Sequence, residues 1–117
     1  IIGKESRIKL VNDKVVEPLA LSYLRGVNID DSILIFEEAQ NSTFIEMKTL
    51  ITRIGTNAKF IISGDLQQID KFKNIEQSGL YDIMNRLEDM KDIGILNFKE
   101  SDSVRNPIIK DILKRYV

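Results

Sequence analysis

The sequence contains neither cysteine nor histidine. The absence of cysteine excludes disulfides, thiolate metal sites and cysteine nucleophiles. The absence of histidine excludes His-based zinc sites and Ser-His-Asp triads. A metal in this protein must therefore be held by oxygen ligands, which favours Mg²⁺. No apolar run approaches the ~18 residues that a membrane span needs, so we expect no membrane contact and a cytoplasmic location.

Glycine, proline and net charge are also scarce. The 117 residues include only 6 Gly and 2 Pro, and the formal net charge is -1. This composition is typical of one globular domain that buries a core, rather than of a disordered chain. The charges are evenly spread, so no bulk basic field indicates nucleic-acid binding, although a local groove is compatible with the composition.

The apolar pattern predicts strands alternating with helices. The runs ILIF at 33–36 and KFIIS at 59–63 are typical of strands buried on both faces of a parallel sheet. A third strand is expected at 93–98. Thr43 and Glu46 are spaced for a capping box, and Asn106 with Pro107 for a helix start. We expect two short strands within 8–16 around a turn at Asn12-Asp13, and helices at 16–26, 43–55, 80–90 and 106–116. The alternation predicts an α/β fold with a mostly parallel sheet.

Polar side chains follow each predicted strand. In chain order these are Glu37, Glu38, Gln40 and Asn41, then Asp65, Gln67 and Gln68, then Asp102 and Arg105. In a parallel sheet the strand ends meet at one edge, where ligands bind. Adjacent carboxylates can hold Mg²⁺ through water and activate an attacking water, a glutamine can sense a γ-phosphate, and an arginine can stabilise transition-state charge. The pattern therefore indicates nucleotide hydrolysis.

Each of these groups also has a structural interpretation. The two carboxylates could be a solvated strand end. Asp65 could be a turn residue or a helix cap. Arg105 could form a surface ion pair with Asp102 or Glu100, and Arg25 could be structural.

The motifs ILIFEEAQN, TRIG, FIISGDLQQID, SGL and SDSVRNP, with YLRG at 23–26, occur in this order. Over roughly residues 15–117 they resemble the PhoH family of P-loop ATPases. The resemblance implies the C-terminal half of a RecA-like P-loop NTPase core, a three-layer, mostly parallel α/β sheet like that of superfamily-one helicases. It also implies ATP and Mg²⁺ as ligands, RNA or single-stranded nucleic acid as a partner, and a ring-shaped homo-oligomer.

The resemblance assigns roles to individual residues. Glu37 and Glu38 match the Walker B pair, with Glu37 serving Mg²⁺ through water and Glu38 acting as the catalytic base. Gln68 matches the γ-phosphate sensor. The remaining matched residues are Gln40 and Asp65 near the phosphates, Arg105 as a sensor or arginine finger, and Arg25 as a further candidate.

Two features depart from the family pattern. The family's Walker B aspartate is Glu37 here, and its extra methylene displaces the carboxylate by about 1 Å, an error that can cost ~10²-fold in rate. The Walker A signature is missing, since Gly3-Lys4 is followed by Glu5. We therefore expect residues 1–117 to be the C-terminal portion of a PhoH-like ATPase domain, from the Walker B strand onward. Without the Walker A half, the sheet is expected to expose apolar strand edges.

These considerations lead to three interpretations. The first is ATP hydrolysis by the parent protein, coupled to nucleic-acid remodelling in helicase-like fashion, with no activity assigned to the chain alone. The alternative is a non-catalytic nucleotide- or nucleic-acid-binding module with a decayed Walker B site. The third is a different helicase-like motor domain.

Overall fold

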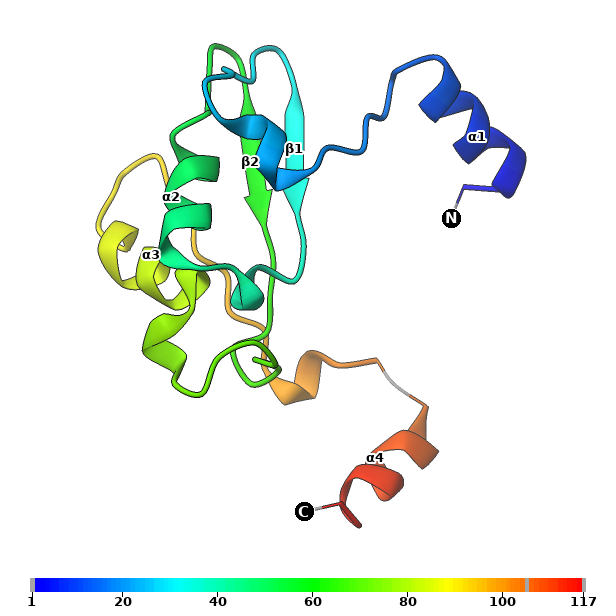
Figure 1. Cartoon of the computed structure of the whole chain (residues 1–117). Helices are drawn as coiled ribbons and strands as arrows, with labels where there is room; N and C mark the ends of the chain where they lie inside the picture. The colour runs from blue at the N-terminus through cyan, green and yellow to red at the C-terminus, as the bar shows by residue number, and fades with distance from the viewer. Residues whose placement is uncertain (1, 105, 117) are drawn as a thin grey trace. The chain divides into compact units, whose positions relative to one another are not determined.

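The computed structural model describes residues 2–104 and 106–116, and only the backbone of Glu100. The chain divides into two compact units, Ile1–Leu87 and Glu88–Val117 (Figure 1). Arg105 lies outside the described residues, so its predicted role and its predicted ion pairs are not addressed by the structure.

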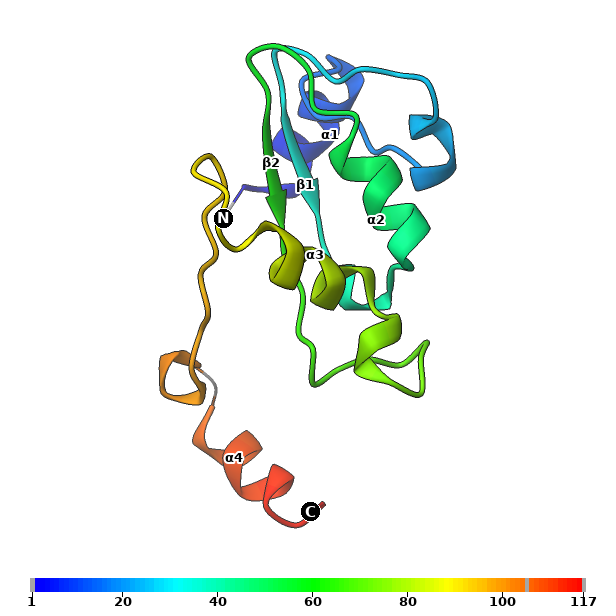
Figure 2. The same ribbon diagram turned by 90° about the vertical axis from the view of Figure 1, so that its left-hand side faces the viewer.

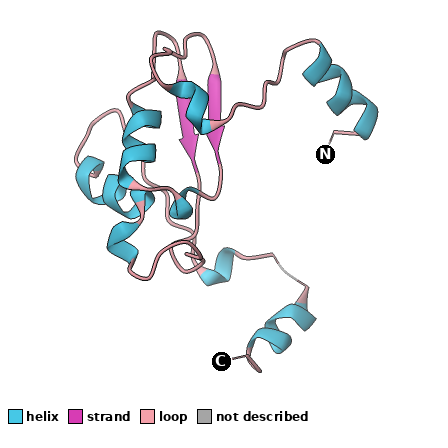
Figure 3. Ribbon diagram, in the orientation of Figure 1, coloured by secondary structure: helices cyan, strands magenta, loops and turns pink. Residues whose placement is uncertain are grey.

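The first unit is built on two parallel strands. β1 (Ile33–Phe36) pairs with β2 (Lys59–Ile62) in a register that runs from Ile33↔Lys59 to Phe36↔Ile62. An isolated parallel bridge between Ile29 and Ile54 extends the pairing. The two strands are drawn side by side in Figure 3. Both strands and their parallel direction are confirmed, so the unit is an α/β structure with a two-stranded parallel sheet.

Helix α2 (Phe44–Ile51) connects the two strands. Its predicted capping box is confirmed: Thr43 Oγ1 accepts a hydrogen bond from the Glu46 backbone N–H at 3.2 Å, and Glu46 Oε2 accepts one from the Thr43 N–H at 2.7 Å. The helix ends at Ile51 with Thr52 as its C-cap, earlier than the expected end at Gly55. The physical reason is that Ile54 is committed to the bridge with Ile29.

Helix α3 (Gly79–Leu87) packs beside α2. The close approach requires glycine at position 79, because a Cβ there would lie 2.5 Å from the Thr43 carbonyl oxygen and 2.8 Å from Met47 Cβ. Met90 lies beyond the end of the helix. The buried apolar side chains of this unit come from several elements and are Leu24, Ala39, Met47, Leu50 and Leu80.

Among the described residues, the core of this unit lies on one face of the sheet. The alternate side chains of β1 and β2 that point toward α2 are half-buried against the core, namely Leu34, Phe36, Phe60 and Ile62. On the opposite face Ile33 and Ile35 are 68% and 65% exposed, and Ile61 is also exposed. In Figures 1 and 2 the helices α2 and α3 lie on the same side of the strands. The prediction of strands buried on both faces is therefore wrong for the described residues.

The N-terminal predictions are also wrong. In place of two strands within 8–16, the structure has helix α1 (Lys4–Asn12). Its hydrogen bonds are local, whereas a hairpin this short has little stability without further strands. The expected turn survives only as the end of this helix, where the Asp13 N–H donates to the Lys9 carbonyl at 2.8 Å.

The helix expected at 16–26 is a single 3-10 turn, η1 (Leu21–Leu24). Pro18 disfavours helical backbone at the residue before it, which delays the turn. Gly26, with a positive φ of 74°, follows where the helix was expected to end. Two further 3-10 turns of this unit are η2 (Ala39–Asn41) and η3 (Ile75–Gln77).

The second unit contains a 3-10 turn, η4 (Glu100–Asp102), and helix α4 (Pro107–Leu113). The expected start of α4 is confirmed, since Asn106 Oδ1 accepts a hydrogen bond from the Ile108 N–H at 3.1 Å. The strand expected at 93–98 is not formed, because this segment has no ladder partner in the described chain. Among the helices of the described residues, none is both long and apolar enough to cross a membrane.

Candidate functional site

The candidate site begins where β1 ends. Glu37 and Glu38 follow the strand directly, and both are exposed. Glu38 has left-handed backbone angles, φ 55° and ψ 34°. This conformation costs a non-glycine residue roughly 1–2 kcal/mol and is often found at functional sites. It turns the chain from β1 into η2, so that the Ala39 N–H donates to the Ser63 carbonyl at 3.0 Å, at the end of β2.

Gln40 connects the two strand ends. It is only 1% exposed. Its Nε2 donates to Glu38 Oε2 at 2.8 Å and to the Gln68 carbonyl at 3.3 Å. Its Oε1 accepts from the Asp65 N–H at 3.1 Å. The buried amide therefore holds the Glu38 carboxylate and the loop after β2 in one fixed arrangement.

Gly64 makes this arrangement possible. A Cβ at this position would lie 2.6 Å from Gln40 Oε1, 2.7 Å from Leu80 Cδ2 and 3.0 Å from the Gln40 backbone nitrogen. Glycine is required here because the backbone passes directly over the Gln40 side chain. Gly64 thus has a packing role, because its lack of a side chain leaves room for the Gln40 amide.

The loop after β2 is shaped by Asp65. Its Oδ1 accepts from the Gln67 N–H at 2.9 Å, and its Oδ2 accepts from Gln68 Nε2 at 2.8 Å. The first contact is the side-chain turn that the structural interpretation of Asp65 predicted. The second orients the Gln68 amide. Asp65 therefore acts as a turn residue that positions Gln68.

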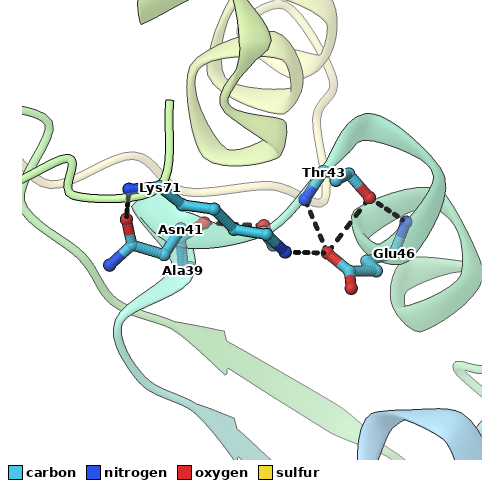
Figure 4. Close-up of polar contacts among 6 residues, drawn as sticks. Ala39, Asn41, Thr43, Glu46 and Lys71 are labelled. Carbon is cyan, nitrogen blue, oxygen red and sulfur yellow. Dashed lines mark hydrogen bonds and ion pairs between the residues drawn. The ribbon is translucent and has the colours of Figure 1, made fainter. Parts of the chain in front are cut away.

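A second set of polar contacts secures the same loop farther along (Figure 4). Asn41 Oδ1 accepts hydrogen bonds from the Asp70 N–H at 3.0 Å and the Lys71 N–H at 3.2 Å. Lys71 Nζ lies 3.6 Å from Glu46 Oε2, in an ion pair that reaches the start of α2. Neither contact was predicted from the sequence, which indicated only that Asn41 belongs to the polar group after β1 and that Lys71 lies in a solvated loop able to touch nucleic-acid backbone. These partners lie 25 to 30 residues apart, too far for a local sequence pattern to predict their contact.

Glu46 is the titratable group whose pKa is clearly shifted among the described residues. The Thr43 backbone N–H is the main cause that lowers the pKa of Glu46, and the Thr43 hydroxyl and Lys71 lower it further, while partial burial opposes them. The carboxylate is thus held ionised at the N-terminus of α2, where the helix dipole favours negative charge.

Of the six predicted site residues that the structure describes, four are joined by hydrogen bonds and two, Glu37 and Arg25, are not. Glu38, Gln40, Asp65 and Gln68 share one hydrogen-bonded cluster, which we call the strand-end cluster. Glu37 is exposed beside it. Arg25 instead lines a pocket on the outer side of α2. No hydrogen bond within the described part of the chain connects Arg25 to the cluster.

The carboxylates of this edge fit Mg²⁺ only as part of a shared coordination sphere. The described residues contain no group of three or more acidic side chains that could hold a metal ion by themselves. Mg²⁺ is commonly bound by one or two carboxylates together with waters and the oxygens of a substrate phosphate. Two exposed, adjacent carboxylates meet that requirement, with Glu38 Oε2 already engaged by Gln40.

These features define an α/β protein with a parallel β-α-β unit and a polar cluster at its strand ends. The model of the family described as "PhoH-like protein" matches residues 1–117. The chain belongs to the PhoH-like protein family.

Individual relatives agree with this assignment. The chain is 34% identical over 116 residues to a PhoH-like protein of Bacillus subtilis (strain 168), covering 99% of this chain and 36% of that protein. It is 36% identical over 108 residues to a PhoH-like protein of Mycobacterium bovis, covering 92% and 30%. It is 36% identical over 101 residues to the protein PhoH of Escherichia coli (strain K12), covering 86% and 28%. The chain thus spans about a third of the length of these curated relatives.

Proposed function

We propose that the strand-end cluster is the Walker B and sensor part of an ATP-hydrolysing P-loop site in a RecA-like core. One observation carries this proposal: the buried Gln40 amide joins the Glu38 carboxylate to the Gly64–Gln68 loop. Hydrolysis of the β–γ phosphoanhydride bond of ATP depends on precise positioning of the group that activates the attacking water relative to the groups that contact the γ-phosphate. The buried Gln40 amide supplies this fixed positioning, because it hydrogen-bonds to Glu38, to Asp65 and to Gln68.

Each residue of the cluster then has a defined task. Glu38 accepts the proton of the attacking water. Its carboxylate is exposed enough to receive that proton, and Gln40 fixes its orientation. Gln68 senses the γ-phosphate, and Asp65 sets the direction of its amide.

Glu37 holds Mg²⁺ through water, and the bound ion would neutralise phosphate charge. Gln40 is only 1% exposed, and its amide is engaged by Glu38, Gln68 and Asp65. Its task is to position Glu38 and Gln68.

The wider proposals rest on the family resemblance. Hydrolysis would be coupled to remodelling of RNA or single-stranded nucleic acid, and Arg105 would act as a sensor or finger, within a ring-shaped homo-oligomer. The exposed face of β1 and β2 supports a larger sheet and core in the whole protein, since Ile33 and Ile35 would otherwise remain in water.

The test is an ATPase assay on the protein at the full length of its open reading frame. Glu38→Gln preserves the size of the side chain and its contact with Gln40, but removes the base. We expect the turnover rate to fall by at least ~10²-fold, with Mg-ATP binding retained. Gln67→Leu, in an exposed neighbouring side chain, serves as the matched control and should leave turnover unchanged.

Equal turnover in the parent and in Glu38→Gln would overturn the enzymatic proposal. Retained ATP binding in that case would favour the non-catalytic module. The glutamate at position 37 is the feature that favours this second candidate. Glu37→Asp tests it directly, because restoring the family's aspartate should leave the turnover of a functional enzyme unchanged or raise it.

A further inference from the structure

A second polar site lies on the outer side of α2. It is a shallow pocket of about 320 Å³ lined by Arg25, Gly26, Phe44, Ile45, Lys48, Thr49, Thr52 and Arg53. Three of these residues are cationic and none is acidic. The chain as a whole has a net charge of -1, so this concentration of positive charge differs from the average surface. The pocket shares no residue with the strand-end cluster.

Within the part of the chain that the structure describes, the three cations of this pocket have no acidic partner. The ion pairs of the described residues are Lys71–Glu46, Arg86–Asp82 and Lys114–Asp111. None of them includes a cation of the pocket. Three unneutralised charges around one concave surface repel each other, and an anion bound between them would relieve that repulsion.

Arg53 supplies an independent observation. Its Nε is buried and has no hydrogen-bond partner within the described residues. Its Nη2 makes one long contact, 3.3 Å, with Thr52 Oγ1. A buried N–H on a charged group without an acceptor is costly. Apart from that contact, no hydrogen bond or ion pair within the described residues engages this guanidinium.

The helix dipole explains only part of this arrangement. The C-terminal end of α2 favours cations, which accounts for Lys48 in the last turn. It does not account for the buried, unpaired Nε of Arg53, or for Arg25, which comes from a separate segment after η1. A ligand with anionic oxygens in this pocket would meet the charges of Arg25, Lys48 and Arg53 together.

Phe44 adds an apolar rim to the pocket. Its side chain is 43% exposed, and Lys48 Nζ lies 6.0 Å from the centre of its ring. Arginine and lysine with nearby threonine hydroxyls bind phosphate oxygens through charge-assisted hydrogen bonds. We propose that this pocket binds a phosphate group, either as a small phosphate anion or as one phosphate of a polynucleotide backbone. This proposal is independent of the nucleotide site proposed at the strand-end cluster.

The test is a titration of the whole chain followed through its backbone amide resonances. Pyrophosphate and an oligouridylate are added in separate experiments. The amides of Gly26, Thr49 and Thr52 are expected to shift in a saturable manner, with little change at Gly64. A response to pyrophosphate identifies a small-anion site, and a response to the oligouridylate alone identifies backbone recognition. No saturable shift at these amides with either probe up to roughly 10 mM overturns the proposal.

Variants provide the second arm. Arg25→Gln with Lys48→Gln removes two exposed cations and should weaken binding by about tenfold or more, and should reduce the salt dependence of oligouridylate binding. Lys9→Gln, on the exposed surface of α1, is the matched control and should bind as the parent does. Equal weakening in the control shows non-specific attraction and overturns the proposal. The wild-type titration decides the matter even if the double variant does not fold.

Discussion

Replacing Gln40 with leucine removes the hydrogen bonds that hold the strand-end cluster while preserving most of the side-chain volume. Three contacts are lost: to the Glu38 carboxylate at 2.8 Å, to the Asp65 N–H at 3.1 Å and to the Gln68 carbonyl at 3.3 Å. The partners at Glu38 and Asp65 belong to exposed residues, so water can partly replace the amide.

The magnitude follows from these contacts. The charge-assisted bond to Glu38 contributes about 1.5 kcal/mol, the bond to Asp65 about 1 kcal/mol, and the long bond to Gln68 about 0.5 kcal/mol. The leucine gains about 1 kcal/mol from its larger apolar surface. The expected net loss in the free energy of unfolding is therefore about 2 kcal/mol. Because the slope in urea is roughly 1–3 kcal/mol per M, the unfolding midpoint should fall by about 1 M.

The assay is urea unfolding monitored by circular dichroism, with Gln67→Leu as the control. That side chain is exposed, and its replacement should change the free energy of unfolding by less than about 0.5 kcal/mol. Hydrogen exchange gives a local reading, since the Asp65 N–H should exchange faster in Gln40→Leu. If the two variants unfold at the same midpoint and the Asp65 amide is unaffected, the positioning role of Gln40 is refuted.

Four further predictions concern the packing at Gly64, the start of α2, the charge of Glu46 and nucleotide binding. Gly64→Ala should lower the free energy of unfolding by about 1–3 kcal/mol, because its Cβ would lie 2.6 Å from Gln40 Oε1. Gly94→Ala is the control, since a Cβ there meets open space and should not destabilise the protein. Equal urea midpoints for the two variants would contradict the packing argument. Thr43→Ala removes the N-cap side chain of α2 and should lower the free energy of unfolding by about 1 kcal/mol. An unchanged thermal midpoint would argue against that cap. Folding lowers the pKa of Glu46, so the ionised carboxylate stabilises the folded state. This contribution to the free energy of unfolding is complete above the ordinary pKa of 4.5, and it is lost as the pH falls through the lower pKa of the folded state. The stability difference between the parent and Glu46→Gln should therefore shrink in acid, and a difference independent of pH would refute this. Calorimetry of residues 1–117 with Mg-ATP should show affinity weaker than micromolar, and micromolar binding would show that the Walker A loop is dispensable.

The parts of the fold that could be predicted are those encoded by short, local signals. The runs at 33–36 and 59–63 are too apolar and β-branched for a surface helix, and both form strands. Thr43 and Glu46 specify their own hydrogen bonds, so the start of α2 could be placed to the residue. Glu38 and Gln68 both accept hydrogen bonds from Gln40, and their common location follows from topology, because parallel strands end at one edge.

The parts that could not be predicted depend on partners distant in sequence. The run ILIF is apolar at every position, so its sequence does not distinguish a strand covered on one face from a strand covered on both. The exposure of Ile33 and Ile35 could therefore not be predicted. The segment 93–98 has strand composition but no neighbour with which to form a ladder in the described chain. The burial of Gln40 depends on the close approach of Gly64, which lies far along the chain. A glutamine next to two glutamates otherwise predicts an exposed, ligand-facing amide.

Three features of the strand-end cluster depend on one another. The left-handed backbone at Glu38 turns the chain inward, which brings the Ala39 N–H to the Ser63 carbonyl and buries Gln40 beneath Gly64. The strain at Glu38 costs roughly 1–2 kcal/mol, and the hydrogen bonds of Gln40 are large enough to offset it. Removing the glycine displaces the amide, and removing the amide leaves the strained turn unsupported. The segments EEAQ and GDLQQ are far apart in the sequence, but they form one structural unit that orients a carboxylate and an amide toward the same edge of the sheet.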